Sequence, residues 1–293
     1  MAQLSVPTVD YTEYSNRQLV AIPLALLAVS LLVIGGWFVV TGAPANLGQE
    51  FTGGSELRIQ DPGANANQQI INAFDVEPAT IQQIPADNAY IITFPEGAVD
   101  AGDRTQLTVL REQAEAAGFE IQASSSVDPS FTSGTTALTG VAVAFLGMSL
   151  LVFIMFRSVA PSIAVIASAF SDVMLPLAMM NLLGIKLTLG TVAALLMLIG
   201  YSVDSDILLN NSILRQSGDF YESTSRAMRT GVTMTLTSIA AMSVMTAAAY
   251  LFGIQIMTAI GTVLVVGLLA DLMNTYLLNV SLLRWYVNRG VKR

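Results

Sequence analysis

The sequence feature that most constrains the fold is the segment 200–211, which follows an apolar run at 191–199. It carries two carboxylates and two amides, namely Asp204, Asp206, Asn210 and Asn211. A charged side chain near the centre of a bilayer costs roughly 2.5–3.5 kcal/mol on insertion scales, so a spanning helix that carries two must turn them toward protein or water. We therefore expect the other membrane helices to pack around this one.

The composition is typical of a membrane protein. Hydrophobic residues make up 53% and charged residues 12% of the 293 residues, and the mean hydropathy is +0.62. Cysteine and histidine are both absent, which removes disulfides, thiol chemistry, the usual general base and the commonest metal ligand. We expect a protein that is not an enzyme and that has no metal site and no cofactor.

Apolar segments long enough to cross a bilayer, which takes about 20 residues, divide the chain. They are predicted at residues 18–41, 134–156, 161–183, 187–209, 231–252 and 256–283. The resulting parts are a tail at 1–17, a soluble domain at 44–133, a five-helix bundle at 134–283 and a basic tail at 284–293. The alternative for the first segment is a signal peptide cleaved near Ala43-Pro44-Ala45, but its apolar run is too long for one.

The distribution of lysine and arginine predicts the orientation, because cytoplasmic segments carry the excess of both. With both termini inside, nine of these residues lie on the inner side and four on the outer side. We therefore predict a multi-pass protein of the cell (cytoplasmic) membrane, with cytoplasmic N- and C-termini and an extracytoplasmic domain at 44–133.

The residues between the first two spans predict a small α+β domain. Alternating or β-branched segments favour strands at 55–60, 80–84, 89–94 and 119–123, and helical spacing favours helices at 64–74 and at 103–117, the latter capped by Asp103. The order βαββαβ is that of a ferredoxin-like sandwich. A polar stretch from about 212 to 229 is expected to be a loop between two spans.

Charge in this domain is strongly acidic. Thirteen acidic residues and three arginines lie between Glu50 and Asp128. The domain lacks the basic footprint that nucleic acid requires, and Gly53-Gly54 lacks the lysine and the length of a phosphate-binding loop. We expect neither nucleic acid nor nucleotide as a partner. A halophilic source and an ordinary acidic exposed domain both remain open.

Several short motifs carry a resemblance to one family. Phe51-Thr52-Gly53-Gly54, directly after the first span, resembles the D-F-T-G-G signature of the SecF family of protein-export membrane proteins, with Glu50 where Asp is usual. Gly200-Tyr201-Ser202-Val203 resembles the G-Y-S-V opening of the family's fourth helix. Val127-Asp128-Pro129-Ser130 resembles its V-G-P motif with Asp for Gly, and residues 267–271 (GLLAD) look closer to the sister subunit SecD.

The resemblance covers nearly the whole chain and implies a six-helix unit of the RND superfamily. It implies an accessory subunit that acts with SecD and the Sec translocon channel on exported preprotein, within membrane lipid, driven in bacteria by the proton gradient. The bacterial motif F-D-R aligns with Asn210-Asn211-Ser212, so its Asp and Arg are missing here. A proton relay carried over from that motif would fail at Asn211, and this departure favours an archaeal member.

The polar groups inside the spans are the candidates for a proton or conformational relay. Asp204 and Asp206 lie about 200° apart on a helix with 3.6 residues per turn, so they face different neighbours. The full candidate set is Asp172, Asp204, Asp206, Asn210, Asn211 and Asp271. Hydrogen bonding between helices is the structural alternative. Thr233, Thr235 and Thr237 are possible donors to the carboxylates.

Two other functions compete with protein export. One is an RND-like small-molecule or lipid transporter subunit, although such pumps usually contain two copies of the six-helix unit and a large outer domain. The other is an intramembrane aspartyl protease, whose G-x-G-D motif is absent because Val203 precedes Asp204.

Overall fold

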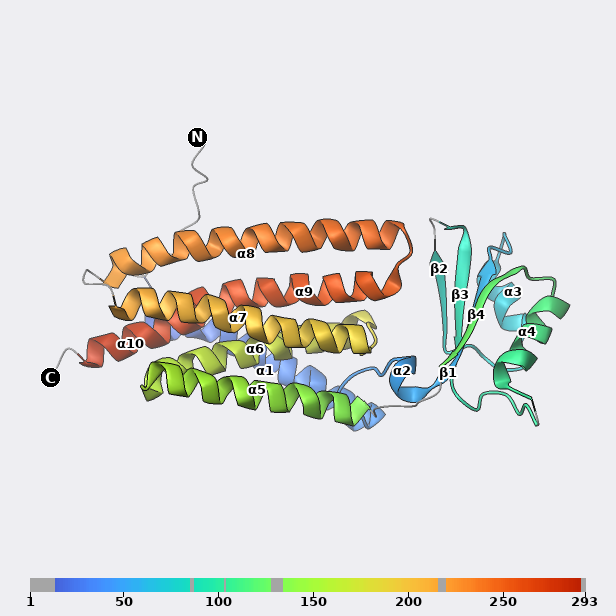
Figure 1. Cartoon of the computed structure of the whole chain (residues 1–293), viewed down its shortest axis with the longest axis horizontal. Helices are drawn as coiled ribbons and strands as arrows, with labels where there is room; N and C mark the ends of the chain where they lie inside the picture. The colour runs from blue at the N-terminus through green and yellow to red at the C-terminus, as the bar shows by residue number, and fades with distance from the viewer. Residues whose placement is uncertain (1–13, 85–86, 103, 128–133, 216–219, 291–293) are drawn as a thin grey trace, which may run out of the picture.

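The computed structural model of the chain describes residues 14–84, 87–102, 104–127, 134–215 and 220–290. Long helices lie side by side in a bundle, and a small domain with a β-sheet lies at one end of them (Figure 1). Six helical segments of the described residues are long and apolar enough to cross a membrane. The fold is thus the predicted α-helical polytopic membrane protein with a small α+β domain.

The bundle consists of long helices that run between its two ends. They are α1 (Asn16–Thr41), α5 (Gly134–Phe156), α6 (Val159–Leu183), α7 (Leu189–Arg215), α8 (Phe220–Leu251) and α9 (Gln255–Met273), which continues through η2 (Asn274–Asn279) into α10 (Val280–Gly290). Asn16, at the start of α1, donates to the carbonyl of Ser281 at 3.3 Å. The first and last parts of the described chain therefore lie next to each other, at the end of the bundle away from the small domain (Figure 1).

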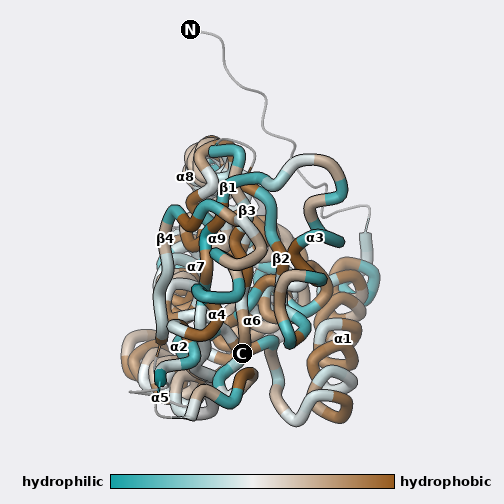
Figure 2. Tube along the Cα trace, turned by 90° about the vertical axis from the view of Figure 1, so that its right-hand side faces the viewer, coloured by the Kyte–Doolittle hydropathy of each residue, from teal (hydrophilic) through white to brown (hydrophobic). Residues whose placement is uncertain are grey.

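Helix α1 begins at a capping box in which the Ser15 side chain accepts from the Gln18 N–H and Gln18 accepts from the Ser15 N–H. It ends at Gly42, whose left-handed backbone (φ 76°) terminates the helix. Many of its apolar side chains are exposed, and the tube of α1 is brown along much of its length in Figure 2. A helix that is apolar all round is expected to face lipid on its exposed sides.

Helices α6, α7 and α9 form the interior of the bundle. Small residues bring α9 close to its neighbours: a Cβ at Gly261 would collide with Thr246 of α8, and one at Gly267 would collide with Leu198 of α7. Close backbone approach at small residues is the usual means of helix packing in membranes. This packing places the polar residues of α6, α7 and α9 next to each other.

The small domain is called the outer domain from here on, after its predicted location. It is built from β1 (Gly54–Gln60), α3 (Ala66–Ala73), β2 (Thr80–Ile84), β3 (Ala89–Phe94), α4 (Gln106–Ala116) and β4 (Ile121–Val127). The sheet order is β2-β3-β1-β4, and all neighbours are antiparallel. This is the predicted ferredoxin-like arrangement. Both helices cover the sheet face that points away from the bundle, and Leu57, Ile59, Ile92 and Leu110 are fully buried between them.

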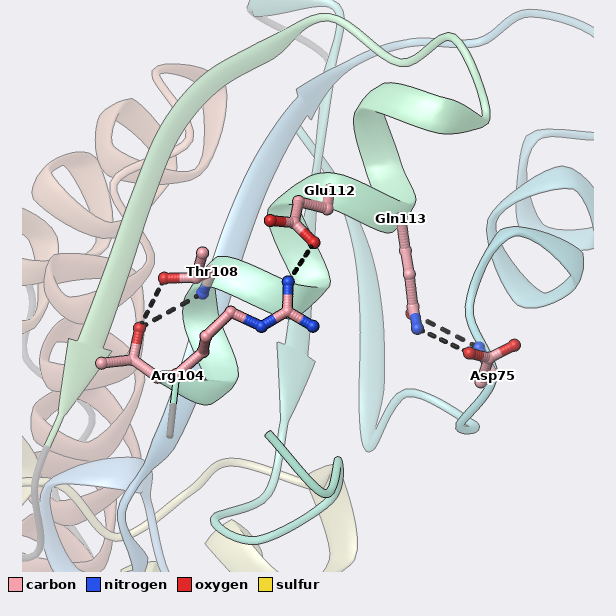
Figure 3. Close-up of polar contacts among 6 residues, drawn as sticks. Asp75, Arg104, Thr108, Glu112 and Gln113 are labelled. Carbon is pink, nitrogen blue, oxygen red and sulfur yellow. Dashed lines mark hydrogen bonds and ion pairs between the residues drawn. The ribbon is translucent and has the colours of Figure 1, made fainter. Parts of the chain in front are cut away.

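Polar contacts fix α4 on this domain (Figure 3). The Thr105 side chain accepts from the Thr108 N–H and so caps the helix. Gln113 donates to the Asp75 carboxylate at 2.7 Å, which ties α4 to the segment that follows α3. The predicted cap, Asp103, lies outside the described residues, as do residues 128–130 of the V-G-P-like motif.

Two sequence-based boundaries were wrong. The stretch 212–229 is largely helical rather than a loop, because α7 continues to Arg215 and α8 begins at Phe220. The last strand is Ile121–Val127 rather than 119–123. The Phe119 N–H donates to the Ala114 carbonyl at 3.0 Å, so Phe119 still belongs to the turn that ends α4.

Candidate functional site

Asp172, in the middle of α6, is completely buried in the bundle. One of its carboxylate oxygens accepts a hydrogen bond from the Ser202 hydroxyl of α7 at 2.6 Å. The other oxygen accepts from the Asn274 amide at 2.6 Å. A single carboxylate therefore connects three separate spans.

Asp206 and Asp271 form the second part of the same site. Asp206 on α7 accepts at one oxygen from Thr275 and from Asn279, each at 2.8 Å. Asp271 on α9 accepts from Ser205 at 2.9 Å. The Thr275 hydroxyl lies 3.4 Å from Asp271 as well as 2.8 Å from Asp206, so it stands between the two carboxylates. We call Asp172, Asp206, Asp271 and their donors the polar cluster.

The donors to these carboxylates are all neutral groups. They are Ser202, Ser205, Asn274, Thr275 and Asn279. Buried carboxylates with only neutral partners are expensive to hold in charged form. A hydroxyl can donate to a carboxylate or accept from a carboxylic acid by rotating. The Thr275 hydroxyl reaches both Asp206 and Asp271, so it can adjust to a change of protonation at either carboxylate.

A π-helical turn supplies much of the cluster. The segment η2 interrupts the last span at Asn274–Asn279, directly after Asp271. Asn274, Thr275 and Asn279 all come from this turn and are buried. Turns of this kind are uncommon and frequently occur at functional sites. The local unwinding thus coincides with the place where α9 meets Asp172 and Asp206.

The structure separates the predicted relay residues into two groups. Asp172, Asp206, Asn210 and Asp271 are buried, at 0%, 0%, 0% and 1% relative exposure. Asp204 and Asn211 are exposed. The opposite directions of Asp204 and Asp206 agree with their helical spacing. Asn210 lies one turn from Asp206 on the same face, and neither polar atom of its side chain has a partner among the described residues.

Sequence reasoning missed Ser205, Asn274, Thr275 and Asn279 as members of the site. The signal was the spacing of the last three behind Asp271, at three, four and eight positions along the helix. This spacing places all of them on one face of the last span. Four polar residues on one face of an apolar helix indicate a buried polar contact.

In the described part of the chain, the threonines predicted as donors in the fifth span form no hydrogen bond to the buried carboxylates. Thr233 and Thr237 donate to carbonyls of their own helix, at Arg229 and Met234. Thr235 is buried and lines a small cavity together with Asp271 and Thr275. This cavity of about 10 Å³ lies between α7, α8 and α9 and is about the size that holds one water molecule.

Residues 44–52, which include the motif after the first span, contact the α6–α7 turn and the start of α7, and we call these contacts the clasp. Residues 49–52 form the short helix α2 (Gln49–Thr52). The Glu50 carboxylate accepts from the Leu189 N–H at 2.5 Å, at the positive end of the α7 dipole. The Gly48 N–H donates to the Leu187 carbonyl at 2.7 Å. A Cβ at Gly48 would lie 2.8 Å from that same carbonyl oxygen, so the close approach requires glycine.

Further contacts extend the clasp to α6. The Asn181 side chain donates to the Pro44 carbonyl at 2.9 Å and accepts from the Asn46 N–H at 3.3 Å. The Leu187 N–H donates to the Asn46 carbonyl at 2.6 Å. The residues that join α1 to the outer domain are therefore fixed to the α6–α7 turn, and α7 connects this clasp to the polar cluster.

The other residues of the two motifs pack against their neighbours or hydrogen-bond to them. Phe51 is buried against the bundle core, and Gly53 and Gly54 both have positive φ angles. A Cβ at Gly54 would collide with the Phe94 carbonyl of β3.

In the second motif, Ser202 is a donor of the cluster, Val203 is buried, and the Tyr201 hydroxyl lies 3.2 Å from Ser238. Gly200 is exposed.

The fold and the polar cluster define a class: a six-span membrane protein with carboxylates between its spans and a small α+β domain at one end. Comparison with known proteins narrows this class. A family model for the C-terminal part of the protein export membrane proteins SecD and SecF matches residues 108–289. The protein-export membrane proteins SecF of Haloquadratum walsbyi and Haloferax volcanii are each 63% identical to this chain over the full length of both chains.

A solved structure agrees with this fold. The crystal structure of SecDF, a translocon-associated membrane protein from Thermus thermophilus, matches 97% of this chain with a TM-score of 0.71 and 20% identity. This chain spans 39% of the length of that SecDF chain. From the family model and the full-length relatives, the chain belongs to the SecF family of protein-export membrane proteins, with relatives in halophilic archaea.

Proposed function

We propose that this chain is an accessory subunit of the Sec protein-export machinery and promotes preprotein translocation across the cytoplasmic membrane. The observation that carries the proposal is the 63% identity to two SecF proteins over the full length of both chains. We infer that it performs no chemical turnover of its own and acts through its membrane helices and outer domain.

SecD is the expected partner. The SecDF structure is a longer chain, and its name combines SecD and SecF. This chain corresponds to 39% of it, so a second chain is expected to supply the remainder. The exposed apolar side chains of α1, α5 and α8 offer surface for that subunit and for lipid, including Leu32, Val143 and Val244.

We propose the orientation from the charge distribution. Nine lysines and arginines lie on the side of the termini and four on the side of the outer domain. We therefore place both termini in the cytoplasm and residues 44–133 outside. The contact between Asn16 and Ser281 supports one common side for the two ends of the described chain.

The polar cluster is proposed as the relay. Asp172, Asp206 and Asp271 lie on three helices. The Thr275 hydroxyl stands between Asp206 and Asp271, and the Ser202 hydroxyl of α7 donates to Asp172. A change in protonation at one carboxylate would change which hydroxyls donate and which accept. Because α7 is held by the clasp at its outer end, a shift of α7 within the cluster would reach the base of the outer domain.

Affinity purification of the tagged chain from native membranes, followed by mass spectrometry, tests this function. We expect a SecD-like protein near one-to-one and translocon subunits in weaker amounts. Recovery of the chain alone as a homo-oligomer would contradict the proposal and favour an RND-like small-molecule or lipid transporter subunit.

A further inference from the structure

A cavity of about 750 Å³ lies between the outer domain and the ends of the bundle helices. One wall is the sheet face that α3 and α4 leave uncovered, which points toward the helix ends in Figure 1. The opposite wall consists of the α6–α7 and α8–α9 turns. The clasp bounds the cavity near Glu50, and Ile84 of β2 packs against Gly253 of the α8–α9 turn.

The sheet wall presents one continuous row of side chains. The strand registers place Ser125 opposite Glu56, Glu56 opposite Thr93, and Thr93 opposite Thr80. These residues come from all four strands, and all line the cavity. Neighbouring strands lie about 4.8 Å apart, so the row is about 14 Å long. Hydroxyl groups dominate it, and each hydroxyl can both donate and accept.

Besides Glu50 of the clasp, one acidic and one basic side chain line the cavity in the described part of the chain. Glu56 lies in the row on the sheet, and Lys186 comes from the α6–α7 turn opposite. Burial raises the pKa of the Glu56 carboxyl, an effect that Lys186 opposes. Burial likewise lowers the pKa of the Lys186 ammonium against the opposing effect of Glu56. Within the described part of the chain these two groups form no direct ion pair with each other.

The chemistry of the walls defines what fits between them. An anionic ligand such as a phosphate group requires several cations or converging N–H donors, and Lys186 is the one basic residue that lines the cavity in the described part of the chain. An acyl chain requires apolar walls on all sides, whereas the sheet wall presents the polar side chains of Thr80, Gln82 and Thr93. A polypeptide backbone is neutral and carries one donor and one acceptor per residue.

We propose that this cavity is a binding site for a short extended segment of the exported polypeptide, held across the row Ser125–Glu56–Thr93–Thr80. An extended chain rises about 3.3 Å per residue, so the row accommodates about four residues. Apolar side chains also line the cavity, among them Ile91 and Val127 on the sheet and Ile256 on the opposite wall, and they provide surface for alternate side chains. This inference rests on the proposed export function and gives it a substrate-contacting surface.

Photocrosslinking of the full chain tests the site. A benzophenone amino acid is placed at Thr80 or Gln82 in the cavity, or at Gln68 on α3 on the other side of the sheet as the matched control. The probe is a fluorescein-labelled 12-residue peptide of Gly, Ser, Thr and Val, added to the chain in lipid nanodiscs together with its co-purifying subunits. We expect labelling at positions 80 and 82 at least five-fold above position 68. Equal labelling at all three, or crosslinks to phospholipid instead of peptide, would overturn the proposal.

A second pair of variants removes the space itself. Thr93→Trp and Ser125→Trp place a bulky ring in the row, and each is expected to reduce labelling from position 80 at least five-fold while the partner subunits still co-purify. Undiminished labelling in both would contradict the cavity site. The two proposals can fail separately: absent labelling with a SecD-like partner recovered refutes only the cavity, whereas labelling without any export partner refutes the export function.

Discussion

Carboxylates have two different environments in this protein. In the outer domain several of them pair with arginines near the surface, as Asp87 does with Arg58 and as Glu112 does with Arg104 at 2.7 Å (Figure 3). In the bundle, Asp172, Asp206 and Asp271 are buried and accept from hydroxyls and amides.

The difference shows what each environment can support. An exposed ion pair is worth only about 0–1 kcal/mol, because water solvates both partners. A buried carboxylate without a permanent counter-charge changes its interactions strongly when it gains or loses a proton. The outer pairs therefore serve local order and solubility, whereas the polar cluster is sensitive to its protonation state.

Neutralising a carboxylate of the cluster is expected to have the largest effect. Asp206→Asn and Asp172→Asn keep the side-chain size but remove the proton site, so we expect at least a ten-fold loss of preprotein translocation in a secretion assay. The matched control is Asp204→Asn, which lies two residues away on the exposed side of the same helix. It is expected to retain activity within two-fold.

The comparison of these variants is decisive when their amounts in the membrane are equal. Loss of export in Asp204→Asn with normal export in Asp206→Asn would show that the exposed side of α7 carries the function. The contrast between buried and exposed carboxylates would then be wrong for this helix.

A smaller effect is expected from the hydroxyl between two carboxylates. Thr275→Val keeps the side-chain shape and removes the oxygen that lies 2.8 Å from Asp206 and 3.4 Å from Asp271. We expect a three- to ten-fold loss of translocation, with Thr233→Val as the control because Thr233 donates only to its own helix. If both valine variants export equally well, the hydroxyl is not part of the relay.

The clasp connects the outer domain to α7, and its loss is expected to affect only the first turn of α7. Glu50→Ala leaves the Leu189 N–H without its acceptor, and the loss of a helix cap costs about 1 kcal/mol. We expect hydrogen exchange at the start of α7 to become about five-fold faster. Glu50→Gln keeps an acceptor oxygen and should recover part of the protection, and Glu96→Ala in the outer domain should leave α7 unchanged. Unchanged exchange in Glu50→Ala would refute the cap.

The sequence predicted the outer domain well, because local signals decide its elements. The strands Thr80–Ile84 and Ala89–Phe94 have the predicted bounds, since the turn-forming residues between them interrupt two β-branched segments. The helix ends near residues 212–229 were missed because hydropathy reports the part of a helix that lies in lipid. Polar residues such as Ser225 and Arg226 continue a helix beyond the membrane without any change of conformation.

The site was predicted only in part. Each buried aspartate was found as a polar residue within an apolar span, but helical spacing describes one helix and does not specify which helices pack together. The convergence of Asp172 with Asn274, 102 residues later, depends on that packing. The π-helical turn at Asn274–Asn279 has no compositional signature either, since it depends on how the last span fits against α6 and α7.

The smallest effect is expected from Glu56 and Lys186 of the outer cavity, and its sign depends on pH. Burial raises the pKa of Glu56 above its ordinary value of 4.5. The stability that this group contributes is therefore fully present below pH 4.5 and is lost as the pH rises through the folded-state pKa. Glu56→Gln should unfold at a slightly higher temperature than the parent chain at pH 7, and this gain should disappear at pH 4.

Lys186→Gln is the matched comparison in the same thermal unfolding experiment. Burial lowers the pKa of Lys186, so the folded chain is destabilised by this charge at every pH below its ordinary pKa of 10.5. Its gain in unfolding temperature should therefore persist at pH 4, where that of Glu56→Gln is absent. A lower unfolding temperature of Glu56→Gln at pH 7 would mean that attraction to Lys186 outweighs burial. A higher unfolding temperature in both variants would show that the two charged side chains destabilise the folded chain, as expected of residues that serve ligand binding rather than stability.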